Sequence, residues 1–207
     1  MVNGTCKEFI DALASGEPVP GGGGASALAG SLGIALGSMV ANITLNSKKY
    51  ENVWDDIKKI LVKTESLKDD LAALISKDAD GFKHVVKAMK MPKESDDEKK
   101  ARDSAMQKAL RISAEAPLEM MRKCGEALIL LDELYEKGSK GVVSDVGVGA
   151  VLCGAALEGA SLNVYANTKY MKNRTYAEDL NKKTKEILEN GAAMSRAIYK
   201  KAEDSIR

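Results

Sequence analysis

The chain has 207 residues, with 31 Lys and Arg against 30 Asp and Glu, so its formal net charge is only +1. This balance excludes the strongly basic surface of general nucleic-acid binders, and an aromatic content of 4% leaves few side chains for base stacking. We therefore expect no nucleic-acid partner. The three cysteines form no C-x-x-C pair and the start of the chain carries no apolar signal segment, which predicts a cytoplasmic protein with free thiols.

Residues 25–45 form a long stretch without a single charge. Its length would suffice to cross a bilayer, which takes about 20 residues. Its hydroxyl and amide side chains favour burial inside protein, and the other predicted helices are amphipathic, as a soluble bundle requires. We therefore expect no membrane partner. A membrane-embedded helix pair is the competing interpretation, and it would partition into detergent.

Apolar residues recur at helical spacing along the chain, and no strand pattern appears. Gly and Pro clusters at 16–24, 91–93 and 138–141 separate the helical segments. Ser95 and Glu98 form a capping box at the start of one of them. We expect kinks at Gly81 and Pro117. The predicted helices are 7–14, 25–46, 51–90, 95–137, 144–171 and 176–205.

Two of these helices, 25–46 and 144–171, consist largely of Ala, Gly and Ser. Small residues at i, i+4 spacing form a ridge on the first, which permits a close helix crossing. We predict an all-α, up-and-down bundle of one domain, 1–207, in which amphipathic helices wrap these two small-residue apolar helices. Their uncharged surface exceeds what one protomer covers, which predicts a homodimer. The ridge residues are Ala25, Ala29, Gly33, Gly37 and Ala41.

Three features carry chemistry, each with a plainer alternative. The glycine run 21–24 before a helix can cradle a ligand with its backbone N–H groups, or serve only as a hinge into a crowded core. Asp78 lies on the apolar stripe of helix 51–90, so it is an acid, base or ligand anchor, or else it takes part in a core salt bridge or a helix-end contact. Asp145 lies in the first turn of a predicted helix, where its charge interacts favourably with the helix dipole. The functional alternative is that it is a lone carboxylate in a largely uncharged pocket.

Amide side chains also lie inside the two apolar helices. Asn42 and Lys49 follow Ser38 on one face of the first, and Asn163 and Asn167 share a face of the second. These amides must find partners, either each other or a heterocyclic ligand with mixed donors and acceptors. Asp145 and Asn163 are separated by about 27 Å along a straight helix, so they cannot contact one small group.

His84 is the only histidine, and its neighbours on the helix surface are charged. We expect it to be exposed and not catalytic. With one histidine and scattered cysteines, the sequence offers no zinc constellation, and Ser-His-Asp or Cys-His catalysis is not expected. We therefore predict no metal site.

Several of these segments, in this order, resemble the cyclodeaminase/cyclohydrolase family of folate enzymes. Gly24 departs from the family pattern, where Ser or a similar residue is expected, and the formiminotransferase domain of the fused enzymes has no counterpart here. The resemblance implies an all-helical dimer that acts on one-carbon tetrahydrofolates. The matching segments are Pro18-Val19-Pro20-Gly21-Gly22-Gly23, Ser38-Met39-Val40-Ala41-Asn42, Lys48-Lys49-Tyr50, Asp78-Ala79 with Phe82, Pro117-Leu118-Glu119-Met120-Met121, Ser144-Asp145-Val146-Gly147-Val148-Gly149-Ala150 and Gly159-Ala160-Ser161-Leu162-Asn163-Val164.

The implied reactions are conversion of 5-formimidoyltetrahydrofolate to 5,10-methenyltetrahydrofolate and ammonia, and hydrolysis of the methenyl compound to 10-formyltetrahydrofolate. The substrate carbon is already an activated amidinium type, so no metal or tightly bound cofactor is needed. In this scheme Asp145 places negative charge near that carbon, and Asp78 or Lys49 transfers protons. The alternatives are a non-catalytic folate-binding protein or a helical scaffold.

The substrate-binding residues expected from this resemblance fall into three groups. The backbone at 21–23 lets the folate approach closely, and the amides hold the pterin. Cationic side chains attract the glutamate tail, with or without polyglutamate. The full expected set is Gly21, Gly22, Gly23, Ser38, Asn42, Lys48, Tyr50, Asn163, Asn167, Lys169 and Arg174.

Overall fold

The computed structural model describes residues 4–207, and all regular structure within this range is helical. The all-α prediction is therefore confirmed. Six α-helices and two short 3-10 helices follow one another along the chain. They are α1 (Cys6–Leu13), α2 (Gly22–Leu45), η1 (Lys48–Val53), α3 (Trp54–Met89), α4 (Asp96–Lys137), η2 (Lys140–Val142), α5 (Val143–Thr168) and α6 (Arg174–Ile206).

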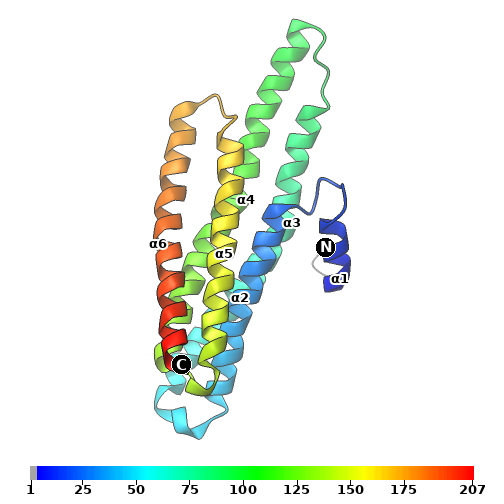
Figure 1. Ribbon diagram of the computed structural model, residues 1–207. Helices are drawn as coiled ribbons and strands as arrows, with labels where there is room; N and C mark the ends of the chain where they lie inside the picture. Colours follow the sequence, from blue (N-terminus) through cyan, green and yellow to red (C-terminus); the bar gives the residue numbers. More distant parts are fainter. Residues whose placement is uncertain (1–3) are drawn as a thin grey trace.

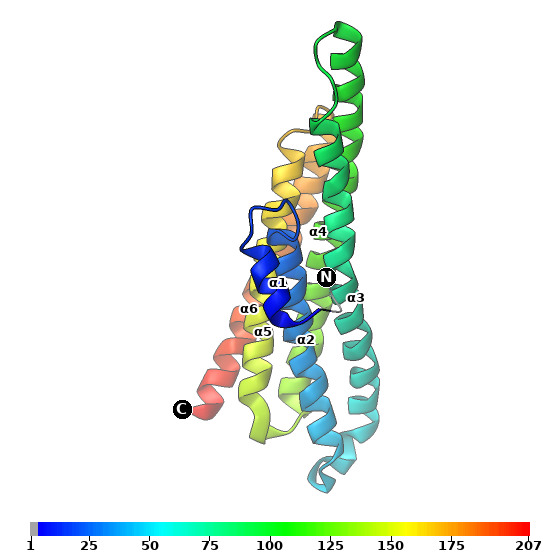
Figure 2. The same cartoon turned by 90° about the vertical axis from the view of Figure 1, so that its right-hand side faces the viewer.

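The five long helices run up and down along one common direction (Figure 1). The connections η1 and η2 lie together at the lower end, where α6 also ends, and the α3–α4 hairpin extends beyond the other helices at the upper end (Figures 1 and 2). The short helix α1 lies at the side of the bundle and has a single buried residue, Phe9. Phe9 packs near Gly24, in the first turn of α2.

Several helix boundaries differ from the sequence prediction. Helix α2 begins at Gly22 rather than at residue 25, because glycine is tolerated in a first turn whose N–H groups need no intrahelical partner. Residues 48–53 form the 3-10 helix η1, so α3 begins only at Trp54. Neither Gly81 nor Pro117 ends its helix. A Cβ on Gly81 would lie 3.3 Å from Cα of Ser113, so this glycine serves the close packing of α3 on α4.

Helices α2 and α5 cross in direct backbone contact. A Cβ on Gly33 would lie 2.8 Å from the carbonyl oxygen of Gly149, and a Cβ on Gly149 would lie 2.7 Å from the carbonyl oxygen of Gly33. The sulfur of the buried Cys153 fills the remaining space next to Gly33. Only glycine fits at these two positions, because any side chain would push the two backbones apart.

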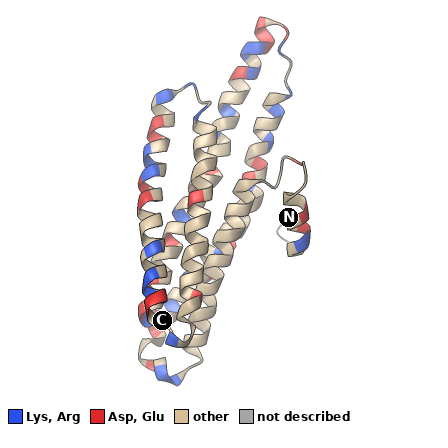
Figure 3. Cartoon of the chain, viewed as in Figure 1, with Lys and Arg blue, Asp and Glu red and all other residues tan. Residues whose placement is uncertain are grey.

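The outward faces of α2 and α5 stay exposed in the single chain. Charged residues concentrate on α3, α4 and α6, whereas α2 has none and α5 only two (Figure 3). By length and composition both helices could cross a membrane, but half of the most apolar window of each is buried inside the protein. The exposed half is mostly apolar, with Leu32 51%, Val148 51% and Leu162 68% exposed, and it also contains the exposed carboxylate of Glu158.

Gly33→Ala should destabilise the protein, because the new methyl group meets the backbone of α5. Such overpacking costs about 1 to 3 kcal/mol, which exceeds the roughly 1 kcal/mol that alanine gains over glycine inside a helix. The matched control is Gly125→Ala in α4, where a Cβ would meet nothing within 4 Å. Urea unfolding should show lower stability for the first variant and equal or higher stability for the second. Equal stability of both variants would contradict the backbone contact.

Candidate active site

A cavity of about 490 Å³ opens where the N-terminus of α2 meets α3, α4 and the C-terminal part of α5. The connecting loop contributes Pro18 and Val19 to its rim, and the first turn of α2 forms its floor. Most of the lining is apolar, and the polar groups gather near α2. This combination of an apolar wall with few convergent polar groups is typical of a small-molecule site.

Asp78 of α3 provides the only charged side chain among the described residues that line this cavity. A Cβ on Gly23 would overlap its carboxylate, so glycine at this position is what allows the carboxylate to rest on the start of α2. Within residues 4–207 the structure shows neither a hydrogen bond nor an ion pair to this side chain. Burial raises the pKa of the Asp78 carboxyl above its usual value.

Two amides of α5 line the same cavity. Asn163 Nδ2 donates to the carbonyl oxygen of Gly159 at 3.0 Å, and Asn167 Nδ2 donates to that of Asn163 at 2.8 Å. Asn167 Nδ2 also lies 3.4 Å from the carbonyl oxygen of Ser113, so both of its N–H groups are engaged and its side-chain oxygen remains as an acceptor. The Asn163 amide keeps one N–H donor besides its oxygen, and its nitrogen lies 3.7 Å from the position of a Cβ on Gly22, beside the start of α2. Together with Asp78, the polar lining suits a heterocyclic ligand with mixed donors and acceptors.

Tyr170 closes one side of the cavity and is held through its backbone. Gln107 Nε2 donates to the carbonyl oxygen of Tyr170 at 3.1 Å, and the N–H of Lys172 donates to Gln107 Oε1 at 2.7 Å. The ammonium of Lys169 lies 5.4 Å from the centre of the Tyr170 ring. Arg174, expected to attract a glutamate tail, donates instead to two carbonyl oxygens at the end of α5.

The remaining predicted site residues lie elsewhere. Ser38 is buried against α3, where its hydroxyl donates to Thr64 Oγ1 at 2.9 Å. The others gather at the lower end of the bundle, about 27 Å from Asn163 along α5. We call Gly21, Gly22, Gly23, Asp78, Asn163 and Asn167 the pocket cluster. We call Asn42, Lys48, Lys49, Tyr50 and Asp145 the basal cluster.

The basal cluster is exposed to half-buried and lies on η1, on the last turn of α2 and on the first turn of α5. The Tyr50 hydroxyl accepts a hydrogen bond from the backbone N–H of Lys140 at 3.0 Å, and this bond lowers the pKa of Tyr50. Asp145 sits near the positive end of α5, as its first-turn position predicts. No residue of this cluster lines the cavity at the upper end.

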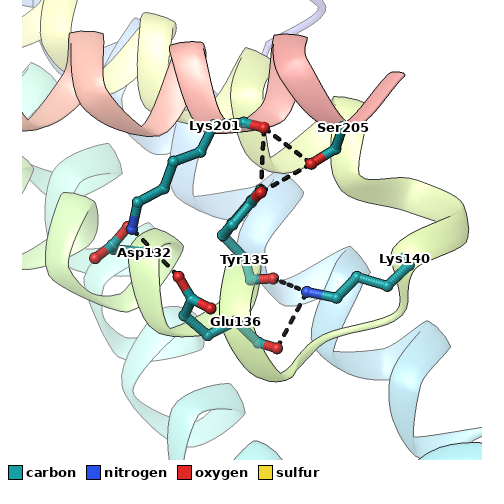
Figure 4. Close-up of polar contacts among 6 residues, drawn as sticks. All are labelled: Asp132, Tyr135, Glu136, Lys140, Lys201 and Ser205. Atoms are coloured by element: carbon teal, nitrogen blue, oxygen red, sulfur yellow. Dashed lines mark hydrogen bonds and ion pairs between the residues drawn. The ribbon is translucent and has the colours of Figure 1, made fainter. Parts of the chain in front are cut away.

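A network around Tyr135 fixes the connections at the lower end (Figure 4). The Lys140 ammonium donates to the last carbonyl oxygens of α4, at Tyr135 and, at 3.1 Å, at Glu136. The Tyr135 hydroxyl donates to the carbonyl oxygen of Lys201 in α6 at 3.1 Å. Lys201 in turn pairs with Asp132 at 2.8 Å and with Glu136 at 3.3 Å. The network therefore ties η2 and α6 to the end of α4.

Sequence reasoning missed the apolar wall of the cavity. Val85, Met89, Met106 and Leu110 belong to the α3–α4 hairpin. Their spacing indicates only an amphipathic helix, and nothing local distinguishes a residue that lines a cavity from one that fills a core. Gln107 was missed for the same reason, since its role depends on a contact with the distant α5–α6 connection.

Comparisons with known proteins agree on one family. The family model described as Formiminotransferase-cyclodeaminase matches residues 5–186. The chain is 40% identical over 204 residues to the methenyltetrahydrofolate cyclohydrolase of Methylorubrum extorquens, covering 99% of this chain and 98% of that protein. It is 30% identical to the formimidoyltransferase-cyclodeaminase of Gallus gallus, of which it spans only 37%.

The fold comparison points the same way. The crystal structure of a formiminotetrahydrofolate cyclodeaminase from Thermotoga maritima matches with a TM-score of 0.82 and 30% identity, over 98% of this chain and 96% of that one. The chain thus shares the fold of that cyclodeaminase over nearly its whole length. The chain belongs to the formiminotransferase-cyclodeaminase family.

Asp78→Asn should stabilise the protein at neutral pH and lose this advantage in acid. The folded state holds the Asp78 proton more tightly than the unfolded chain, so wild-type stability falls as pH rises from about 3.8, the ordinary pKa, through the raised folded value. Asparagine cannot ionise and escapes this loss. Urea unfolding of both proteins at pH 3.5 and pH 7 measures the difference. A difference independent of pH would show that Asp78 ionises as freely in the folded protein as in the unfolded chain.

Proposed function

We propose that the cavity between α2, α3 and α5 is the active site of a one-carbon tetrahydrofolate enzyme. The reaction converts 5-formimidoyltetrahydrofolate to 5,10-methenyltetrahydrofolate and ammonia, hydrolyses the methenyl compound to 10-formyltetrahydrofolate, or does both. The observation that carries this proposal is the side chain of Asp78. This carboxylate is half-buried, has no hydrogen bond or ion pair within residues 4–207, and lines a cavity whose other described residues are uncharged. The cyclohydrolase that is 40% identical over nearly the whole chain supports the same chemistry.

Both reactions pass through a tetrahedral carbon between N5 and N10 of the folate. In the first, N10 attacks the amidine carbon and gives up its proton, and the C–N bond to the amino group then breaks as that nitrogen takes up a proton and leaves as ammonia. In the second, water attacks the methenyl carbon and loses both of its protons as the formyl C=O forms. One of these protons goes to N5 as the bond from the carbon to N5 breaks, and the other goes to solvent. A carboxyl group whose pKa burial raises above its usual value suits both reactions, because it both accepts and donates a proton.

The lining of the cavity suits the two ends of a folate. The side-chain oxygens of Asn163 and Asn167 accept hydrogen bonds from pterin N–H groups, and the backbone of 21–23 lets the ring approach α2 closely. The apolar wall from α3 and α4 accommodates the p-aminobenzoyl group. Lys169, exposed beside Tyr170 at the rim, attracts the glutamate tail.

We further propose that the protein is a cytoplasmic homodimer. The support is the exposed apolar face of α2 and α5, which carries Leu32, Val148 and Leu162 at half exposure or more. Patches of this kind mark sites where another molecule packs. Helix α2 carries no charge and α5 carries two carboxylates, of which the exposed Glu158 is the one charged group between Val151 and Leu162.

The direct test is spectrophotometric. Purified protein is offered 5-formimidoyl- and 5,10-methenyltetrahydrofolate in turn, and the methenyl absorbance is followed. We expect it to rise with the first substrate, to fall with the second, or to do both. Folate binding without any change in absorbance would favour a non-catalytic folate-binding protein, and the absence of binding would refute the proposal.

Asp78→Asn should lower kcat by about 10²- to 10⁴-fold, the usual contribution of a positioned acid or base, because the amide cannot transfer the proton. The matched control is Asp80→Asn, two residues along α3, whose exposed carboxylate pairs with Lys83 at 2.8 Å. This control should keep wild-type kcat and KM. If Asp78→Asn keeps wild-type kcat while its folate affinity falls, Asp78 anchors the substrate and another group moves the proton.

A further inference from the structure

The pocket cluster and the basal cluster occupy opposite ends of the same two helices. Asp145 and Asn163 are eighteen residues apart on α5, which is five full turns at 3.6 residues per turn, so both side chains leave the helix in the same direction. The axial distance between them is about 27 Å. Helix α2 runs antiparallel to α5, since Gly22 lies beside Asn163 and Gly33 lies beside Cys153. The α2–α5 pair therefore carries one cluster at each of its two ends.

The surface between the clusters is the exposed apolar face of α2 and α5. Leu32 of α2 and Val151 of α5 are 51% and 45% exposed near its middle. The exposed α5 residues between Val151 and Leu162 are the small Ala155 and one carboxylate, Glu158. This face contains no lysine or arginine on either helix. A second copy of the chain suits this face, because the same apolar surface then covers itself.

The midpoints of the two helices lie at one level. The midpoint between Asp145 and Asn163 is Gly154, and the midpoint of α2 falls at Gly33 and Ile34. A Cβ on Gly33 would lie 3.1 Å from the backbone nitrogen of Cys153, so these midpoints are neighbours. A two-fold axis that lies between the two copies at this level, parallel to the face and perpendicular to both helices, reverses the direction of the second copy. It carries one end of α5 onto the other, and thus the basal end of one protomer onto the pocket end of its partner.

We propose that the active site is completed across such an antiparallel dimer, in which the partner's Asp145 reaches the cavity beside Asn163. This inference rests on the proposed function, since it names a second group of the same site. The partner's Asp145 adds a second carboxylate next to the cationic amidinium carbon, where negative charge stabilises the reacting group. The partner's Lys48 and the partner's Lys49 belong to the same cluster as Asp145, so they lie near the opening of the cavity, where their positive charges attract the carboxylates of the folate tail. Each dimer then contains two composite sites.

The test combines two variants in one dimer. Asp78→Asn and Asp145→Asn chains are co-expressed with different tags, and the mixed dimer is isolated by purification on both tags. If the two chains share their sites, the intact Asp78 of the Asp145→Asn chain lies in one site with the intact Asp145 of the Asp78→Asn chain. One of the two sites is then complete, and the other lacks both carboxylates. The mixed dimer should have about half of the wild-type kcat per dimer, whereas each parent homodimer should be at least about 10²-fold slower.

Other outcomes separate this inference from the proposed function. If wild type is active but the mixed dimer is no faster than its parents, one chain supplies both residues and the composite site is refuted. Wild-type activity of the Asp145→Asn homodimer refutes it as well. If wild type converts neither folate, the proposed function fails, and the arrangement of the dimer is judged by cross-linking alone.

Cross-linking tests the antiparallel geometry without any activity. Ala155 lies next to the midpoint of α5, so in this dimer it meets its own copy. Ala155→Cys in a Cys6→Ser background should form a covalent dimer on mild oxidation, while the remaining thiols are buried and burial raises the pKa of Cys124 to about 12. The control Lys99→Cys, exposed at the tip of the α3–α4 hairpin, should not cross-link. A monomer in light scattering, or partition of the protein into detergent, would overturn the proposal.

Discussion

The arrangement of the molecule depends on the backbone contact between α2 and α5. Gly33 and Gly149 bring the two helices so close that each would overlap a side chain on the other. Direct contact of this kind fixes the position of one helix along the other, because the two glycines must lie opposite each other for the backbones to approach this closely. Gly22 is thereby placed beside Asn163, and the first turn of α2 becomes the floor of the cavity.

The candidate site reflects a second close approach, between Gly23 and the carboxylate of Asp78. Glycine at position 23 makes room for this carboxylate at the start of α2, and burial raises the pKa of the carboxyl above its usual value. The amides of α5 complete the polar lining, so the chemistry of the cavity follows from the meeting of α2, α3 and α5.

Much of this organisation could be predicted from the sequence. The helical spacing, the capping box at Ser95 and the small-residue character of α2 and α5 identify the helices to within a few residues. The buried position of Asp78 follows from its apolar neighbours at helical spacing. The sequence could not place Asn42 relative to Asn163, because that depends on which ends of α2 and α5 meet. It also could not identify Met89 and Met106 as cavity wall, since packing between distant segments decides which apolar residues face a hollow.

The hydrogen bonds of Lys140 have a consequence for how the lower end of the bundle comes apart. Its ammonium closes the end of α4, and its backbone N–H holds Tyr50 of η1. Tyr135, whose carbonyl oxygen it binds, is itself fastened to α6. Fraying of any one of these segments releases partners in the others, so η1, η2 and the end of α6 open together as one cooperative region rather than independently.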